Sequence, residues 1–157
     1  MQKIKLYLKP HQAAYLKSIC GTPPHVGAKY NLAPLLLSLL RWEEYQITEK
    51  GISAFVPDWV MESSGGKNNL SERGHKVFGD YINSLMDIDF WDYIKPYYLN
   101  HRLELKDGIY LFIDKHNLPN ADNKVYNMLI KRFYRIRKTQ QKEKNPAEFF
   151  ADISILK

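Results

Sequence analysis

The sequence predicts a mainly α-helical protein of the α+β class, with a small β element at the start of a helical domain. Residues 3–9 alternate lysine or tyrosine with isoleucine or leucine, which is the period of a strand that buries one face. Beyond residue 30, apolar residues recur every three or four positions, as on the buried face of a helix. Residues 124–140 contain neither glycine nor proline, so they can form a long helix.

Length and composition indicate a soluble protein with a real hydrophobic core. The 157 residues suffice for one domain or two small ones, and the 45% hydrophobic share excludes a disordered or low-complexity chain. The single cysteine, Cys20, excludes an internal disulfide and a cysteine-based zinc site. No apolar run approaches a membrane span, and the segment Met1–Lys5 lacks the apolar stretch of a signal peptide. We therefore expect a cytoplasmic protein that does not associate with membranes.

Residues 1–62 are expected to form a strand, two helices and a hairpin, in that order. Pro10 suits the first turn of a helix, where its missing N–H costs no hydrogen bond, and Gly21 suits the helix end. Asn31 is a typical N-cap for a second helix, whose leucines form an apolar stripe. Lys50-Gly51 has the composition of a hairpin turn between two short strands.

A loop over residues 63–69 is predicted to separate this first region from a helical region over residues 70–157. The loop contains two serines followed by two glycines, which favours a flexible connection. The last part of the helical region, residues 145–157, holds five large apolar side chains. We expect this tail to pack on the body of the protein or against a second subunit.

The helical region is expected to contain four helices. Asn69 and Glu72 have the spacing of a capping box at the start of the first. A short second helix over Ile88–Lys95 would be limited by the proline that follows it. The third helix is expected over Leu103–His116 and the fourth over residues 124–140.

Positive charge is concentrated in one short part of the chain. Lysine and arginine number 23, aspartate and glutamate 17, and the net charge is +6. Seven basic residues and one acidic residue lie within Lys131–Lys144, and the rest of the chain is balanced. A local excess of this kind indicates a site for a polyanion. The alternative is a solvated helix end, where cations suit the negative end of the helix dipole.

The fourth predicted helix has an apolar face and a basic face when its residues are placed at 100° intervals. Arginine and asparagine can bond to guanine and adenine edges, and cations can hold phosphates. Lys124 and Asn127, near the start of the helix, would approach base edges, and the later cations would contact the phosphate backbone. The candidate residues on this helix are Lys124, Asn127, Lys131, Arg132, Arg135, Arg137 and Lys138.

The third and fourth predicted helices, within residues 103–140, resemble the helix-turn-helix family of DNA-binding proteins. In that family the second helix enters the major groove, and its first residues meet base edges. The connection Asn117–Asp122 is longer than the family's tight turn and lacks its glycine. The resemblance implies a non-enzymatic, sequence-specific double-stranded DNA-binding protein, such as a transcriptional regulator or an accessory factor of a mobile element.

Residues 3–42 are similar in outline to the ribbon-helix-helix family, because a basic strand precedes two helices. In that family, strands from two subunits pair and their outward side chains read the major groove. The resemblance implies a homodimer in which Lys3 and Lys5 contact DNA, although the loop over residues 21–30 is longer than the family's turn. The alternative is a surface strand whose lysines guard its edge against aggregation.

The sequence gives no reason to expect an enzyme or a cofactor. The five histidines lack the spacing of metal-ligand motifs, and Cys20 lies at a predicted helix end, which does not favour a thiolate. Asp58 and Glu104-Leu-Lys106 resemble the carboxylate-plus-lysine arrangement of restriction-type nucleases, but the second part begins a helix instead of lying on a neighbouring strand. Two other functions stay open: RNA binding, and a protein-interaction or phage-type structural role with the basic helix as docking face.

Overall fold

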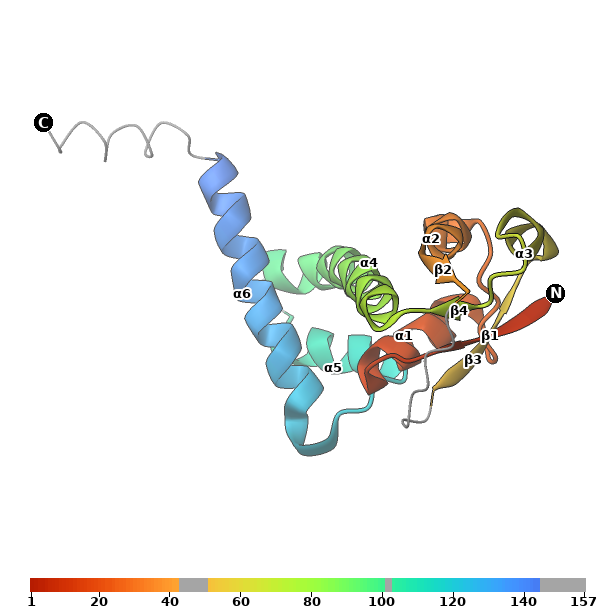
Figure 1. The fold of residues 1–157 in the computed structure, drawn as a ribbon. Coiled ribbons are helices and arrows are strands. Elements are labelled where there is room, and N and C mark those ends of the chain that lie inside the picture. Colours follow the sequence, from red (N-terminus) through yellow and green to blue (C-terminus); the bar gives the residue numbers. More distant parts are fainter. Residues whose placement is uncertain (43–50, 101–102, 145–157) are drawn as a thin grey trace, which may run out of the picture.

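The computed structural model describes residues 1–42, 51–100 and 103–144 (Figure 1). Within these ranges the α-helices are α1 (Pro10–Cys20), α2 (Leu32–Leu39), α3 (Asp58–Ser63), α4 (Glu72–Leu99), α5 (Leu105–Lys115) and α6 (Lys124–Lys144). The strands are β1 (Gln2–Leu6), β2 (Leu40–Arg41), β3 (Ile52–Val56) and β4 (Asn69–Leu70). Short 3₁₀ turns, Lys29–Asn31 and Ala121–Asn123, precede α2 and α6. The predicted fold class, a mainly helical protein with a small N-terminal β element, is confirmed.

Strand β3 stands in the middle of the β element. On one side it pairs antiparallel with β1, and the register places Ile4 opposite Ala54 on the buried face. On the other side Val26 N–H donates to the Phe55 carbonyl, and Phe55 N–H donates to the Pro24 carbonyl, both at 2.8 Å. The burial of alternate residues in β1 is the pattern that the sequence predicted.

The pairing of β3 with β1 bears on two expectations about the N-terminal half. The strand after Gly51 was expected to pair with the segment just before it, but its described partner is β1. The first strand of the predicted hairpin, and Lys50 itself, lie outside the described residues. The ribbon-helix-helix resemblance implies that the N-terminal strand pairs with a second subunit. One edge of β1 is occupied by β3 of the same chain, and the pairing with a second subunit stays a prediction.

Helix α1 begins and ends as predicted, whereas the start of α2 differs. Pro10 is the first residue of α1, and Gly21 follows its last turn with φ of 86°. The side chain of Gln12 accepts the Lys9 N–H at 2.9 Å and donates to the Gly79 carbonyl at 3.0 Å, so it links the start of α1 to α4. Asn31 occupies the predicted N-cap position of α2, but its φ is 55° and its side chain makes no capping bond.

The segment between β3 and α4 contains the short helix α3 and the strand β4, which the sequence did not reveal. Val60 and Met61 of α3 are buried, and Ser64 Oγ lies within hydrogen-bonding distance of the Met61 and Lys67 carbonyls, at 2.8 and 3.0 Å. Residues 63–69 thus have local hydrogen bonds, and their predicted flexibility stays a prediction.

Helix α4 is one continuous helix where two were predicted. Its N-cap is Ser71, whose hydroxyl accepts the Gly74 N–H at 3.1 Å, and Asn69 lies in β4 instead. Pro96 lies inside the helix, at a cost of about 3 kcal/mol in a helix interior. Five fully buried side chains at four-residue spacing oppose that cost: Phe78, Ile82, Met86, Phe90 and Ile94. Neither α4 nor any other helix of the described residues is long and apolar enough to cross a membrane.

Helices α4, α5 and α6 pack against one another and form the C-terminal part of the core. Gly108 of α5 lets the two backbones approach, because a Cβ there would lie 2.6 Å from Cγ of Tyr97 in α4. Helix α6 contributes Val125, Leu129 and Phe133, which are buried as predicted. Figure 1 shows α6 along one side of the molecule and β1 on the opposite side. The packing predicted for the tail concerns residues 145–157, which lie outside the described residues.

Candidate nucleic-acid interface

Helix α6 presents a line of exposed polar side chains opposite its buried face. We call these five residues the α6 basic face: Lys124, Asn127, Lys131, Arg135 and Lys138, all exposed. From the first to the last of them the helix rises about 21 Å. The only acidic residue of the helix is Glu143, in its last turn. The exposure of these residues agrees with the helical periodicity of the sequence.

The start of α6 is held in place by its own connection and by α5. The Asn120 side chain accepts the Tyr126 N–H at 2.9 Å, so one of the unpaired N–H groups of the first turn is satisfied. Asp122 and Asn123 have φ of 53° and 56°, a left-handed conformation that short polar side chains tolerate. The Tyr110 and Tyr126 rings stack with centroids 4.9 Å apart. The N-terminal end of the α6 basic face therefore rests on a defined support.

Arg132 does not belong to the exposed face, which corrects its predicted position. Its guanidinium donates to Asp87 Oδ1 at 2.6 Å and to Asn83 Oδ1 at 3.4 Å, and the residue is only 8% exposed. His11 Nε2 lies 3.3 Å from the same Asn83 oxygen. We call these four residues the Arg132 cluster. It joins α6 to α4 and α1, so Arg132 positions the helix.

Arg137 is also turned towards the body of the protein. It is half-buried, and its guanidinium carbon lies 4.9 Å from the centre of the Tyr98 ring, a cation–π distance. Both arginines were expected beside the basic residues of α6 because of their charge, although their angular positions on the helix differ from those of the exposed residues. Arg132 lies seven residues, or two turns, after Val125, and this spacing already assigns it to the buried face.

The charges of the α6 basic face lack a carboxylate partner among the side chains that the structure describes. Within residues 1–42, 51–100 and 103–140, none of its four cations lies in an ion pair with a carboxylate. The positive potential along α6 is therefore available to an external anion.

Lys3 and Lys5 are exposed on the outer face of β1, as predicted, but the structure does not bring them to α6. Strand β1, which carries both lysines, lies on the side of the molecule opposite to α6 (Figure 1). Lys3 Nζ lies 5.6 Å from the centre of the Phe55 ring on the neighbouring strand. A single surface that includes both sets of predicted DNA contacts is therefore not formed within one chain.

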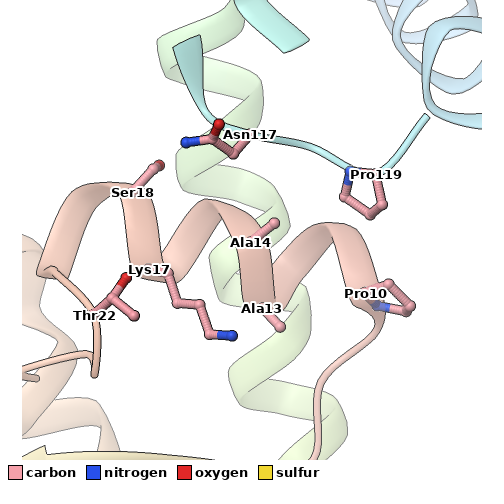
Figure 2. A pocket seen from close by; sticks show the side chains of 8 residues that line it. All are labelled: Pro10, Ala13, Ala14, Lys17, Ser18, Thr22, Asn117 and Pro119. Carbon is pink, nitrogen blue, oxygen red and sulfur yellow. The ribbon is translucent and has the colours of Figure 1, made fainter. Parts of the chain in front are cut away.

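An open pocket of about 510 Å³ lies between α1 and the segment that connects α5 to α6, shown in Figure 2. Ser18 lines this pocket, and its Oγ lies 2.7 Å from Nδ1 of His116. A Ser–His pair can supply a nucleophile and its base. Here the hydroxyl donates its single proton to the Tyr15 carbonyl at 2.7 Å, so the imidazole must donate to Ser18. The pair therefore ties α1 to the end of α5, and Ser18 is not activated.

The protein should lose stability as the pH falls below neutrality. Burial lowers the pKa of His11, His75 and His116 below the ordinary value of 6.5, because a charged imidazole is poorly solvated inside the protein. Histidines of the unfolded chain then take up protons at a higher pH than those of the folded protein, so protons favour unfolding. The stability is full above about pH 7 and decreases as the pH passes below 6.5.

Urea denaturation at several pH values between about 7.5 and 5.5 measures this loss, which can reach about 1.4 kcal/mol per pH unit for each such histidine. Replacing His116 with glutamine should make the free energy of unfolding depend less steeply on pH, whatever its effect on stability at neutral pH. A free energy of unfolding that stays constant over this range would contradict the assignment.

No protein-family model matches the chain, and neither a curated protein nor a solved structure matches it. No group of three or more histidine, cysteine, aspartate or glutamate side chains in the described parts of the chain could hold a metal ion. The helix-turn-helix and ribbon-helix-helix resemblances thus stay hypotheses.

Proposed function

We propose that the protein binds double-stranded DNA through the α6 basic face, as a non-enzymatic regulator or accessory DNA-binding protein. The observation that carries the proposal is the line of exposed cations on one side of a single helix, without carboxylate partners in the described part of the chain. Phosphates supply most of the affinity in such complexes, and base edges supply the specificity.

The dimensions of α6 suit the major groove. A helix fits this groove in width, and the 21 Å rise of the α6 basic face, at about 1.5 Å per residue, extends over about six base-pair steps. In this orientation Lys124 and Asn127 would approach base edges, and Lys131, Arg135 and Lys138 would contact phosphates. Arg132 and Arg137 are left out of the contact set because their guanidinium groups are engaged with α4.

Binding to mixed-sequence duplex DNA should depend steeply on salt and should be lost when two charges of the α6 basic face are reversed. With three cations on phosphates, the logarithm of the binding constant should fall against the logarithm of salt with a slope of about −3. Lys131→Glu/Arg135→Glu should weaken binding at least about 30-fold and make the slope shallower by about 2. Fluorescence anisotropy at about 50 and 200 mM salt measures both quantities.

Two further variants test whether the position of the charge matters. Arg73→Glu/Lys76→Glu changes one arginine and one lysine, both exposed, in the first turns of α4. Arg73 lies about 21 Å along the helix from Asp87, the contact with α6, so duplex affinity should change little. Asp122→Asn removes a negative charge next to Lys124 and should strengthen binding by a few-fold.

Four results would contradict the proposal. Binding that is insensitive to salt, or equal loss in both double variants, would remove the α6 basic face from the site. Preference for a structured RNA over duplex DNA of the same length would assign the protein to RNA binding. Absence of any nucleic-acid affinity would leave the helix as a docking face for an acidic protein.

A further inference from the structure

The outer face of the β element places two lysines beside two stacked rings. In the β1–β3 ladder Lys3 is opposite Phe55, and Lys5 is opposite Ser53, so all four side chains share the face that is turned away from Ile4 and the core. His25 is bridged to Phe55 on the other edge of β3. The two rings stack with centroids 5.1 Å apart and an interplanar angle of 25°.

This ring pair is held in place by backbone hydrogen bonds. His25 N–H donates to the Cys20 carbonyl at 2.9 Å; Phe55 N–H donates to the Pro24 carbonyl, and the Phe55 carbonyl accepts the Val26 N–H, both at 2.8 Å. His25 is exposed and Phe55 is half-buried, so the stack has one end in solvent and the other against the sheet. A rigid, partly exposed stack loses little conformational freedom when another flat ring is added to it.

We propose that this face, which consists of Lys3, Lys5, His25 and Phe55, binds single-stranded nucleic acid, with an unpaired base stacked on the His25–Phe55 pair. Any of the four bases can stack on an aromatic side chain, and nearby cations can bind the phosphates of the same strand. Lys3 and Lys5 lie two residues apart on a strand, so their Cα atoms are separated by about 7 Å along the backbone. This proposal adds a second nucleic-acid site to the DNA-binding function proposed above, and it rests on that function only for the choice of nucleic acid as the partner.

The charge of this face favours a polyanion over an apolar partner. Both lysines are exposed, and neither forms an ion pair within the described ranges. Lys3 Nζ lies 5.6 Å from the Phe55 ring centre, a cation–π distance. From this position the flexible lysine side chain can reach a phosphate next to a base that stacks on the rings. If the lysines only shield the strand edge, the rings contribute nothing to binding.

The test uses three fluorescent probes of equal length, roughly 12 nucleotides: oligothymidine, its abasic phosphodiester analogue, and a duplex. The wild-type protein should bind oligothymidine about 10-fold more tightly than the abasic strand, because only the former can stack. His25→Ala/Phe55→Leu should remove that preference and leave duplex binding unchanged. Circular dichroism and urea denaturation establish that the variant is folded.

The two proposals fail in different ways. Lys131→Glu/Arg135→Glu should abolish duplex binding and preserve the preference for oligothymidine over the abasic strand. If oligothymidine binding is lost in this α6 variant and kept in His25→Ala/Phe55→Leu, the oligonucleotide binds to α6. The inference about the β element is then overturned. The same holds if wild type binds the abasic strand equally well or binds only the duplex. If it binds oligothymidine with the expected preference but not the duplex, the sheet site stands and the proposed function of α6 fails.

Discussion

Replacing Phe133 with alanine should lower the free energy of unfolding by about 3–5 kcal/mol, the largest single-residue effect expected in α6. Phe133 is 1% exposed, and its ring lies 6.0 Å from that of Trp91 and 5.5 Å from that of Tyr98, measured between centroids. Truncation removes the aromatic contacts that attach the second half of α6 to α4. Urea denaturation followed by circular dichroism measures the loss.

The neighbouring residue supplies a matched control. Tyr134 has an aromatic ring of similar size on the same helix but is 57% exposed, so Tyr134→Ala should cost less than about 1 kcal/mol. If the two substitutions had equal effects, α6 would not be packed against α4 through Phe133. The loss expected for Phe133→Ala would be a large part of the free energy of unfolding of an ordinary domain, which is about 5–15 kcal/mol.

The sequence predicted the elements whose pattern is local and missed the contacts that join distant segments. The two-residue alternation of β1 and the apolar spacing of α5 and α6 are visible in a short window. The pairing of Lys3 with Phe55 joins positions some 50 residues apart, and no short pattern contains that information. The strand after Gly51 was therefore recognised as a strand, but its described partner, β1, was not predicted.

Helix α4 shows how burial overrides a local signal. Pro96 was interpreted as a limit to the helix because proline breaks the hydrogen-bond ladder. The chain continues to Leu99 because Ile94 is fully buried and Tyr97 packs against Gly108 of α5. Since this packing partner lies on another helix, the local pattern alone could not reveal the continuation.

For the candidate site, angular position on the helix was more informative than charge. All five residues of the α6 basic face are exposed where the helical period places them. The high local charge drew Arg132 into the same set, although its spacing from Val125 assigned it to the core side. Its partner Asp87 lies 45 residues earlier on another helix, which only the fold reveals.

Arg132→Ala should lower the free energy of unfolding by about 2–3 kcal/mol, because it leaves the Asp87 carboxylate without its partner. The value is below that of a fully buried pair because the Asp87 side chain is 36% exposed and water can replace part of the lost bond. A double-mutant cycle with Asp87→Ala should give a coupling energy of about 1–3 kcal/mol. Urea denaturation of the four proteins measures it.

Arg135→Ala is the matched control for Arg132→Ala, because it removes an arginine three positions further along α6. Arg132 is expected to support the helix, and Arg135 is expected to contact DNA. Arg135 is exposed and has no carboxylate partner in the described part of the chain, so its removal should change stability by less than about 0.5 kcal/mol. Arg135→Ala should nevertheless weaken duplex DNA binding several-fold. Under conditions in which Arg132→Ala is fully folded, that variant should retain most of its affinity for duplex DNA, with an unchanged salt slope. If Arg132→Ala instead made the salt slope shallower by about 1 without loss of stability, its guanidinium would reach a phosphate, and the division of α6 into a supporting face and a binding face would be wrong.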